Sequence, residues 1–380
     1  MSRFFSGIIS NDLPNIKRQT EIDLVRGLAV LFMILVHASS EFLDESYNNT
    51  IFAKVIDFFG CVPAAPVFMF VMGVGFIYSK NQDPKKLIKR GLFIFAGGYM
   101  LNFFRGFLPQ IIGNNLGFYS IPFNQLKQYL LAVDILQFAG LAMIVVSLLR
   151  FLRISPAFYP LFAIAAGIAS PYLWGITSSN PVLKFLCLVA FGGQAYTFHP
   201  LFSWIFYPLM GAFFGWLLIR AKNKNKFYLA SGIISILIAC AAFIYFYFFN
   251  SAIDFGILSG KIYNYFHHGI LSNIIFCSSI VWWISVWNFL TAILPQFIKK
   301  RLIFWSKSVT VIYVIHWLLI GWCEYLVLDS YGIWQTILIM ITLIFFTDRL
   351  ADLHNKIRER LSDREKVDIP VVLEAARLDK

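Results

Sequence analysis

The sequence predicts an all-α polytopic membrane protein with about ten transmembrane helices and with both termini in the cytoplasm. Three observations support this fold class. Of the 380 residues, 59% are apolar and only 14% are charged, a balance that lies outside the range of soluble globular proteins. The apolar residues gather in runs of about 20, the length that crosses a bilayer core of about 30 Å. Lys and Arg are concentrated in alternate loops, as membrane topology requires.

Each expected span is an apolar run bounded by polar or basic residues. In chain order, the runs cover about residues 22–40, 55–78, 90–108, 129–149, 156–174, 201–219, 227–249, 270–293, 303–325 and 331–348. Their spacing leaves no room for a sizeable soluble domain. We therefore assign residues 1–349 to one transmembrane domain and the charged residues 350–380 to a short cytoplasmic tail.

The basic residues predict the orientation of these spans. If the N-terminus lies inside, the cytoplasmic segments are the N-terminal stretch, 79–90, 150–153, 220–226, 299–307 and the tail. These segments hold 27 of the 32 Lys and Arg residues, and the other five, Arg105 among them, fall on the opposite side. The asymmetry predicts an N-in, C-in topology. It also accounts for the net charge of +12, so we expect no nucleic-acid partner.

The cysteines point to neither a disulfide framework nor a metal site. Five cysteines are scattered along the chain, mostly inside expected spans, and no CxxC pair occurs. Such cysteines are typical of small buried apolar side chains. We therefore expect no bound metal.

The first expected span carries two groups that are costly in hydrocarbon, Arg26 and His37. Eleven residues of α-helix make three turns plus about 20°, so both side chains leave the same helix face, about 16 Å apart along the axis. Asp23 precedes Arg26 by one turn and can form an ion pair with it. The acidic residues before Arg26 also disfavour the alternative of a signal peptide cleaved after Ala38.

Apolar residues occupy the face between Arg26 and His37, namely Val30, Met33 and Ile34. A cation at the inner mouth, an apolar wall and an imidazole at the far end would suit a long, thin ligand with a polyanionic head. Acyl-coenzyme A has that shape. We therefore expect an acyl-CoA passage along this face of the helix.

Two other spans place polar groups at a similar depth. His316 lies about thirteen residues into the ninth span, and Asp134 lies near the outer end of the fourth. With His37 they could support general-base or nucleophilic chemistry, because a carboxylate can fix the tautomer of a neighbouring imidazole. The same three groups could instead relay protons in a proton-coupled transporter, although no internal repeat of the kind common in transporters is visible.

Several stretches resemble the transmembrane acyltransferase superfamily, which includes the acyltransferase-3 family and the heparan-α-glucosaminide N-acetyltransferase-like proteins. The matching stretches are "EIDLVRGLAV" with His37, residues 65–102, "DILQFAGLAMIV" (134–145), "PLMGAFFGWLL" (208–218) and "SKSVTVIYVIHW" (306–317). The resemblance implies transfer of an acyl group, commonly acetyl, from cytoplasmic acyl-CoA to a hydroxyl or amine of a sugar or glycan on the outer side. It also implies a location in a bacterial inner membrane, and leaves open a homo-oligomer.

The resemblance assigns roles to specific positions. His37 matches the catalytic histidine, as base or transient acyl carrier, and Arg26 matches its motif partner. The basic cluster, defined as Lys86, Lys89 and Arg90, matches the position of an Arg-x-x-Arg pair in acyltransferase-3 members. The exact pair is absent here. We expect the basic cluster, with Arg26, to contact the nucleotide of the donor.

Each candidate also has a purely structural interpretation. Arg26 could be an anchor paired with Asp23, His37 and His316 could be buried hydrogen-bonded imidazoles, and Asp134 could be a water-exposed acid at a helix start. The basic cluster could serve only to mark the cytoplasmic side of the membrane. Three further histidines in expected outer loops receive no role: His199, His267 and His268.

Overall fold

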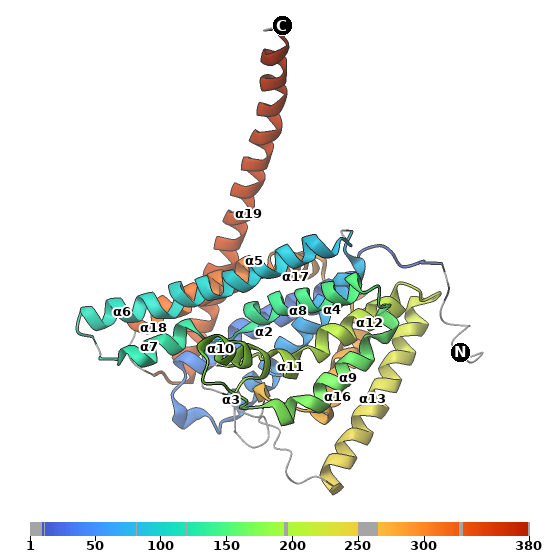
Figure 1. Cartoon of the computed structure of the whole chain (residues 1–380), viewed down its shortest axis with the longest axis horizontal. Coiled ribbons are helices and arrows are strands. Elements are labelled where there is room, and N and C mark those ends of the chain that lie inside the picture. The colour runs from blue at the N-terminus through green and yellow to red at the C-terminus, as the bar shows by residue number, and fades with distance from the viewer. Residues whose placement is uncertain are drawn as a thin grey trace.

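The computed structural model is a bundle of helices from which the last helix projects (Figure 1). The structure describes residues 10, 12–80, 82–118, 120–193, 197–249, 265–326 and 330–378. Within these residues the regular structure is helical, and extended pairing is limited to two isolated bridges. The predicted all-α class is confirmed.

Among the described residues, seven helical stretches are long and apolar enough to cross a membrane. They are Thr20–Phe42, Ile51–Tyr78, Pro84–Asn115, Pro156–Leu173, Leu201–Leu218, Lys224–Tyr245 and Ile270–Leu290. An eighth is obtained if two helices that meet at 82°, Gln296–Lys307 and Val309–Cys323, are taken as one span. A polytopic membrane protein is therefore confirmed, whereas the orientation of the chain stays a prediction.

The described residues form the following helices. The first half contains α2 (Thr20–Phe42), α3 (Ile51–Gly60), α4 (Ala65–Tyr78), α5 (Pro84–Asn102), the π-helix η2 (Phe103–Phe107), α6 (Leu108–Asn115), α7 (Phe123–Leu130), α8 (Ile135–Phe151) and α9 (Tyr159–Leu173). The second half contains α10 (Pro181–Phe191), α11 (Leu201–Trp204), α12 (Phe206–Leu218), α13 (Lys224–Phe249), α16 (Ile270–Leu290), α17 (Gln296–Lys307), α18 (Val309–Leu326) and α19 (Ile333–Leu378). Two short 3-10 helices, Glu45–Tyr47 and Pro156–Phe158, lie between them.

The fourth, ninth and tenth expected spans differ most from their predicted form. The fourth, 129–149, starts later, because α8 begins at Ile135 and has 17 residues. The ninth, 303–325, is divided into α17 and α18 at Ser308, since the polar KKR run of α17 does not suit hydrocarbon and turns away from the apolar α18. The tenth is the start of the 46-residue α19, which crosses the expected boundary at 349/350 without a break, so the domain division stays a prediction.

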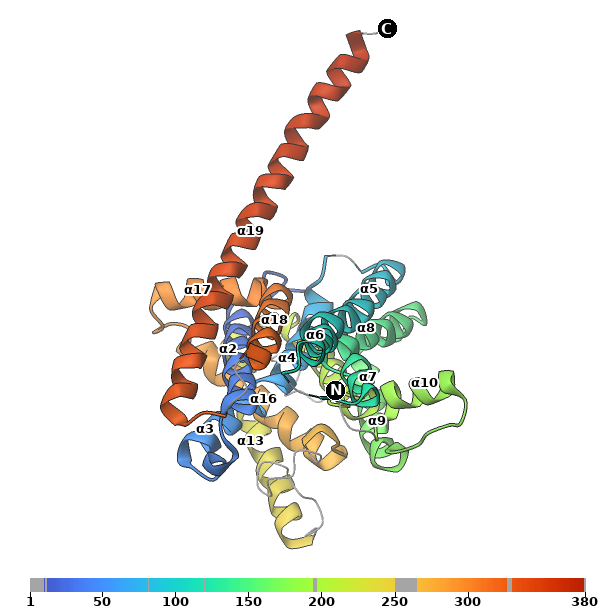
Figure 2. The ribbon, with the colours of Figure 1, turned by 90° about the vertical axis from the view of Figure 1, so that its left-hand side faces the viewer.

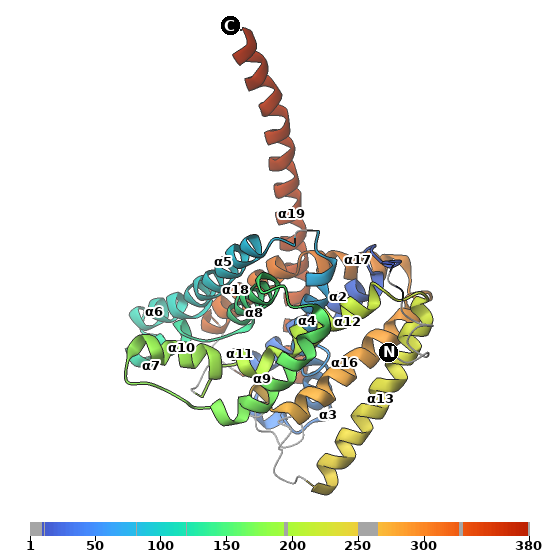
Figure 3. The ribbon, with the colours of Figure 1, turned by 45° about the vertical axis from the view of Figure 1, so that its right-hand side comes forward.

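The centre of the bundle is α2, the helix that carries Arg26 and His37. It packs against α3, α4, α16, α17, α18 and α19, and Figure 2 shows α17 and α18 beside it. Leu24, Val25 and Ala29 are completely buried. By contrast, α13 lies at the edge of the bundle (Figure 3) and exposes a series of large apolar side chains. Such a surface is expected where lipid replaces water.

The last helix is hydrogen-bonded to α17 and to the bend that follows it at Ser308. Trp305 Nε1 donates to Asp348 Oδ1 at 2.7 Å, and Asn355 Nδ2 donates to Ser308 Oγ at 2.7 Å. At the far end of α2, Leu43 forms a parallel bridge with Tyr331. These contacts tie α19 and the segment before it to α17, to the bend at Ser308 and to the end of α2.

Candidate active site

Two histidines from different parts of the chain meet inside the bundle. His37 Nδ1 of α2 lies 3.0 Å from His316 Nε2 of α18, and the two rings are nearly parallel, with centroids 5.3 Å apart. His316 is fully buried, whereas His37 keeps part of its surface exposed. The next residue on α18, Trp317, packs its ring 4.3 Å from that of His37. Two residues that the sequence placed at similar depth are thus in direct contact.

The hydrogen bonds around His316 fix the tautomers of both rings. His316 Nδ1 lies 3.1 Å from the carbonyl oxygen of Ile312. A carbonyl oxygen only accepts, so this Nδ1 carries the proton, and the Nε2 of a neutral His316 must accept. His37 Nδ1 is then the donor in the contact between the rings. The lone pair of His37 therefore lies on Nε2, which makes no hydrogen bond to the described residues.

A second polar centre forms around Asp134, where α8 begins. Asp134 Oδ2 accepts from Arg105 Nη2 and from the Tyr313 hydroxyl, each at 2.8 Å, and Oδ1 accepts from the backbone N–H of Ile135 at 2.7 Å. The backbone N–H of Asp134 donates to Gln137 Oε1 at 3.2 Å, which completes a capping box. The carboxylate is only 8% exposed, so Asp134 does begin a helix but does not face water.

His199, for which the sequence predicted no role, belongs to this second centre. Its Nδ1 lies 3.2 Å from Asp134 Oδ1, and its ring packs 4.4 Å from that of Trp204. The chain reaches this point because Thr197 forms a parallel bridge with Val133. Nothing in the pattern around residue 199 could have predicted this contact, because it joins segments that are distant in sequence.

The two centres are connected through α18. Tyr313, which binds Asp134, lies one turn before His316, and their rings are 5.3 Å apart. The Trp317 ring contacts His37 and also lies 4.1 Å from the guanidinium carbon of Arg105. His37, His316 and Asp134 thus belong to one buried cluster, as expected. Arg105, which the sequence predicted only as one of the basic residues on the outer side, lies inside this cluster, against Asp134 and Trp317.

Arg26 lies near the start of α2, away from the two histidines. Its Nη2 donates to Asp23 Oδ1 at 2.9 Å, which confirms the expected ion pair, and its Nε donates to Ser306 Oγ at 2.7 Å. Ser306 in turn donates to Asp23 at 2.9 Å, and Arg18 pairs with the same carboxylate. Arg26 therefore joins α2 to α17 through Nε and Ser306, and its Nη2 orients Asp23, which also bonds Ser306.

The apolar strip between Arg26 and His37 is packed core. Val30, Met33 and Ile34 are 0%, 6% and 2% exposed, so the passage expected along this face is closed. The reason is the close approach of α17. A Cβ atom added to Gly27 would lie 2.3 Å from the carbonyl oxygen of Leu302, so the two backbones touch and leave no room for a ligand between them.

The basic cluster lies on the first turns of α5, with all three side chains exposed. Asp83 caps this helix by accepting from the backbone N–H of Lys85 at 2.9 Å. The structure does not bring the basic cluster into contact with the two histidines. Glu41 lies near the end of α2, one turn beyond His37 and far from Arg26. It is exposed and interacts electrostatically with Arg105.

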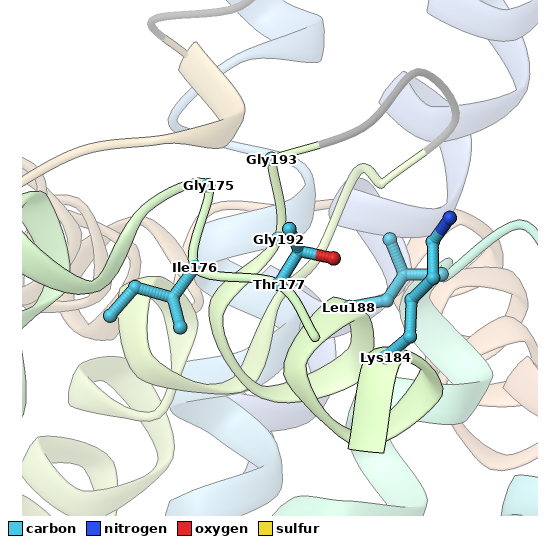
Figure 4. A pocket seen from close by; sticks show the side chains of 7 residues that line it. All are labelled: Gly175, Ile176, Thr177, Lys184, Leu188, Gly192 and Gly193. Carbon is cyan, nitrogen blue, oxygen red and sulfur yellow. The ribbon is translucent and has the colours of Figure 1, made fainter. Parts of the chain in front are cut away.

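A pocket is also present between α9 and α10 (Figure 4). Its lining consists of Gly175, Ile176, Thr177, Lys184, Leu188, Gly192 and Gly193. None of these residues belongs to the cluster around His37 and Asp134. The pocket therefore adds nothing to the candidate site.

Comparison with known proteins gives one family. Residues 18–244 match the catalytic domain of heparan-alpha-glucosaminide N-acetyltransferase, a match that covers more than half of the chain. It includes Arg26, His37, Arg105, Asp134 and His199, and ends before α18. A search of curated proteins gave no match.

Proposed function

The chain belongs to the heparan-alpha-glucosaminide N-acetyltransferase catalytic family, and we propose that it transfers an acetyl group from acetyl-CoA to an amine or hydroxyl of a sugar. The family supports a membrane acetyltransferase that acts on a glycan. The name of the family favours the amine of an α-linked glucosamine as acceptor. Membership of the wider superfamily with acyltransferase-3 stays a prediction.

The observation that carries the proposal is the free lone pair on His37 Nε2, which results from the His37–His316–Ile312 chain of hydrogen bonds. We propose that His37 Nε2 removes a proton from the acceptor as its nitrogen or oxygen attacks the thioester carbonyl carbon. The carbonyl electron pair moves to oxygen, then reforms the double bond and expels the CoA thiolate. The proton on His37 passes to that thiolate. Positioned general bases of this kind contribute about 10²–10⁴-fold to rate.

His37 as a base is preferred to His37 as an acyl carrier. A histidine with its Nδ1 proton held by a neighbouring acceptor has the tautomer of an oriented base. The alternative, a covalent acyl-His37, predicts that radiolabelled protein accumulates when donor is given without acceptor. Direct transfer predicts no such label.

The proposed donor site combines exposed cations with the buried cluster. The basic cluster on α5 would contact the phosphates of CoA, and Arg26 would act through Asp23 and Ser306 by fixing α2 against α17. The thioester must then reach His37 by a route other than the α2–α17 contact. Under the predicted N-in topology, the acceptor would approach from the end of α2 that exposes Glu41.

Acetyl transfer with matched histidine variants tests the proposal. The full-length protein in lipid nanodiscs would be given radiolabelled acetyl-CoA and a methyl α-glucosaminide. We expect His37→Gln to lower kcat by about 10²–10⁴-fold and His354→Gln, a change at an exposed histidine of α19, to leave it unaltered. Wild-type protein that neither binds acetyl-CoA nor transfers its acetyl group to any sugar amine or hydroxyl would refute the proposal.

A further inference from the structure

Arg105 has a guanidinium nitrogen without a hydrogen-bond partner among the described residues. Its Nη2 donates to Asp134 Oδ2 at 2.8 Å and to Asn102 Oδ1 at 3.1 Å. Its Nη1 is buried and has no hydrogen-bond partner among the described residues. A buried N–H group left unpaired is unfavourable, and such groups in native proteins call for an explanation. A ligand atom that accepts from Nη1 would supply one.

The charges around Arg105 indicate what kind of acceptor atom fits. Asp134 already forms an ion pair with the guanidinium, and Glu41 interacts with it electrostatically. A ligand carboxylate or phosphate at Nη1 would therefore add a third negative charge to one positive charge. A neutral carbonyl oxygen that gains negative charge only during a reaction matches the site better.

The position of Arg105 places this donor close to the proposed base. The indole ring of Trp317 contacts the guanidinium on one hand and His37 on the other, at 4.1 and 4.3 Å. Arg105 also lies in the π-helix η2, a type of irregularity that often occurs at functional sites. The same cluster thus contains an oriented base and an unused, charged hydrogen-bond donor.

The backbone at Arg105 is held rigidly. Gly321 of α18 packs directly on it, since an added Cβ atom would lie 2.0 Å from the carbonyl oxygen of Arg105. The carboxylate of Asp134 fixes the other end of the side chain. A donor held in place before the reaction stabilises developing charge without reorganising.

We propose that Arg105 is a catalytic residue whose Nη1 donates a hydrogen bond to the thioester carbonyl oxygen of the donor. This role rests on the proposed acetyl transfer. When the acceptor attacks the carbonyl carbon and His37 takes its proton, the carbonyl electron pair moves to oxygen, and Arg105 stabilises that oxyanion. When the pair returns, the carbon–sulfur bond breaks, and the CoA thiolate takes the proton from His37.

Two variants that affect the same carboxylate provide the kinetic test. Arg105→Lys keeps a cation beside Asp134 but removes the second donor, whereas Tyr313→Phe removes the other hydrogen bond to Asp134 Oδ2. We expect Arg105→Lys to lower kcat about 10²–10³-fold with little change in KM for acetyl-CoA. Tyr313→Phe should lower it by less than about tenfold. Both variants should still bind S-ethyl-CoA, a thioether without the carbonyl, as the wild type does.

A spectroscopic measurement on the wild-type protein tests the same contact if Arg105→Lys does not fold. With acetyl-CoA labelled with ¹³C at the carbonyl, we expect the isotope-edited infrared stretch to move to lower wavenumber on binding. A bound carbonyl stretch equal to that in solution, or an Arg105→Lys kcat within a few-fold of wild type, would overturn the role of Arg105 while acetyl transfer itself persists. Absence of acetyl-CoA binding to the wild type would overturn the proposed function, and this role with it.

Discussion

Replacement of His316 by Phe should separate the base from the residue that orients it. The change removes the acceptor that lies 3.0 Å from His37 Nδ1 and keeps a ring at this fully buried position. A net hydrogen bond contributes about 1 kcal/mol when both partners are neutral and about 2 kcal/mol when one is charged. His37 becomes charged only in the transition state, so the difference, about 1 kcal/mol, is the part that affects kcat. That corresponds to a loss of about five- to tenfold.

Single-turnover acetyl transfer by the full-length protein in nanodiscs would measure this loss. His316→Gln serves as the conservative variant, because its side-chain oxygen can still accept from His37 and should recover part of the rate. His37→Gln should be far more damaging, at about 10²–10⁴-fold. If His316→Phe is as inactive as His37→Gln, His316 is the base and the assignment of tautomers is incorrect. If His316→Phe has wild-type activity, the two rings are not coupled in the reaction.

Three further predictions concern the donor, the packing and the loop after α2. Neutralising the basic cluster (Lys86→Gln, Lys89→Gln, Arg90→Gln) should raise KM for acetyl-CoA about tenfold or more and leave KM for the phosphate-free donor S-acetyl-N-acetylcysteamine unchanged; an equal effect on both would exclude phosphate contact. Gly27→Ala should destabilise the protein by about 1–3 kcal/mol in thermal unfolding, because the new Cβ would overlap the Leu302 backbone; a neutral result would mean that α2 and α17 separate easily. Hydrogen bonds from Ser330 and Ser46 lower the pKa of Asp44 to about 2. The contribution of these bonds to the stability of the fold is complete above pH about 3.8 and is lost as the pH falls toward 2. Over that range, the melting temperature of Asp44→Asn should fall less than that of the wild type.

Composition and periodicity were sufficient to predict the fold class, because a bilayer imposes both span length and charge asymmetry. They were insufficient for the elements that break the pattern. The bend at Ser308 lies inside an apolar run, and its position depends on the polar face of α17 and on Asn355 from a helix later in the chain. Likewise, α8 begins at Ile135 because Asp134 caps it in a capping box, a local signal within a stretch whose hydropathy continues upstream.

The candidate site was predictable where its members share one helix or a common depth. His37 follows from its place inside an apolar helix, and His316 and Asp134 follow from counting residues into their spans. Arg26, on the same helix as His37, lies outside the cluster. Arg105 and His199 were missed for the same reason: each reaches Asp134 from a segment more than 25 positions away along the chain. A count of Lys and Arg in each loop treats such an arginine only as a signal of membrane orientation. Its contact with the Asp134 carboxylate becomes visible only in the folded structure.

The bend between α17 and α18 gives α2 two points of attachment, one on each side of a corner. Arg26 is joined to Ser306 before the corner, and His37 to His316 after it. Because α2 is bonded to both helices, it fixes the angle at which α17 and α18 meet. A change in that angle would have to break one of the two hydrogen bonds. The position of Arg26 and the geometry of the His37–His316 pair are therefore coupled, and a substitution at one end of α2 should alter the contacts at the other end.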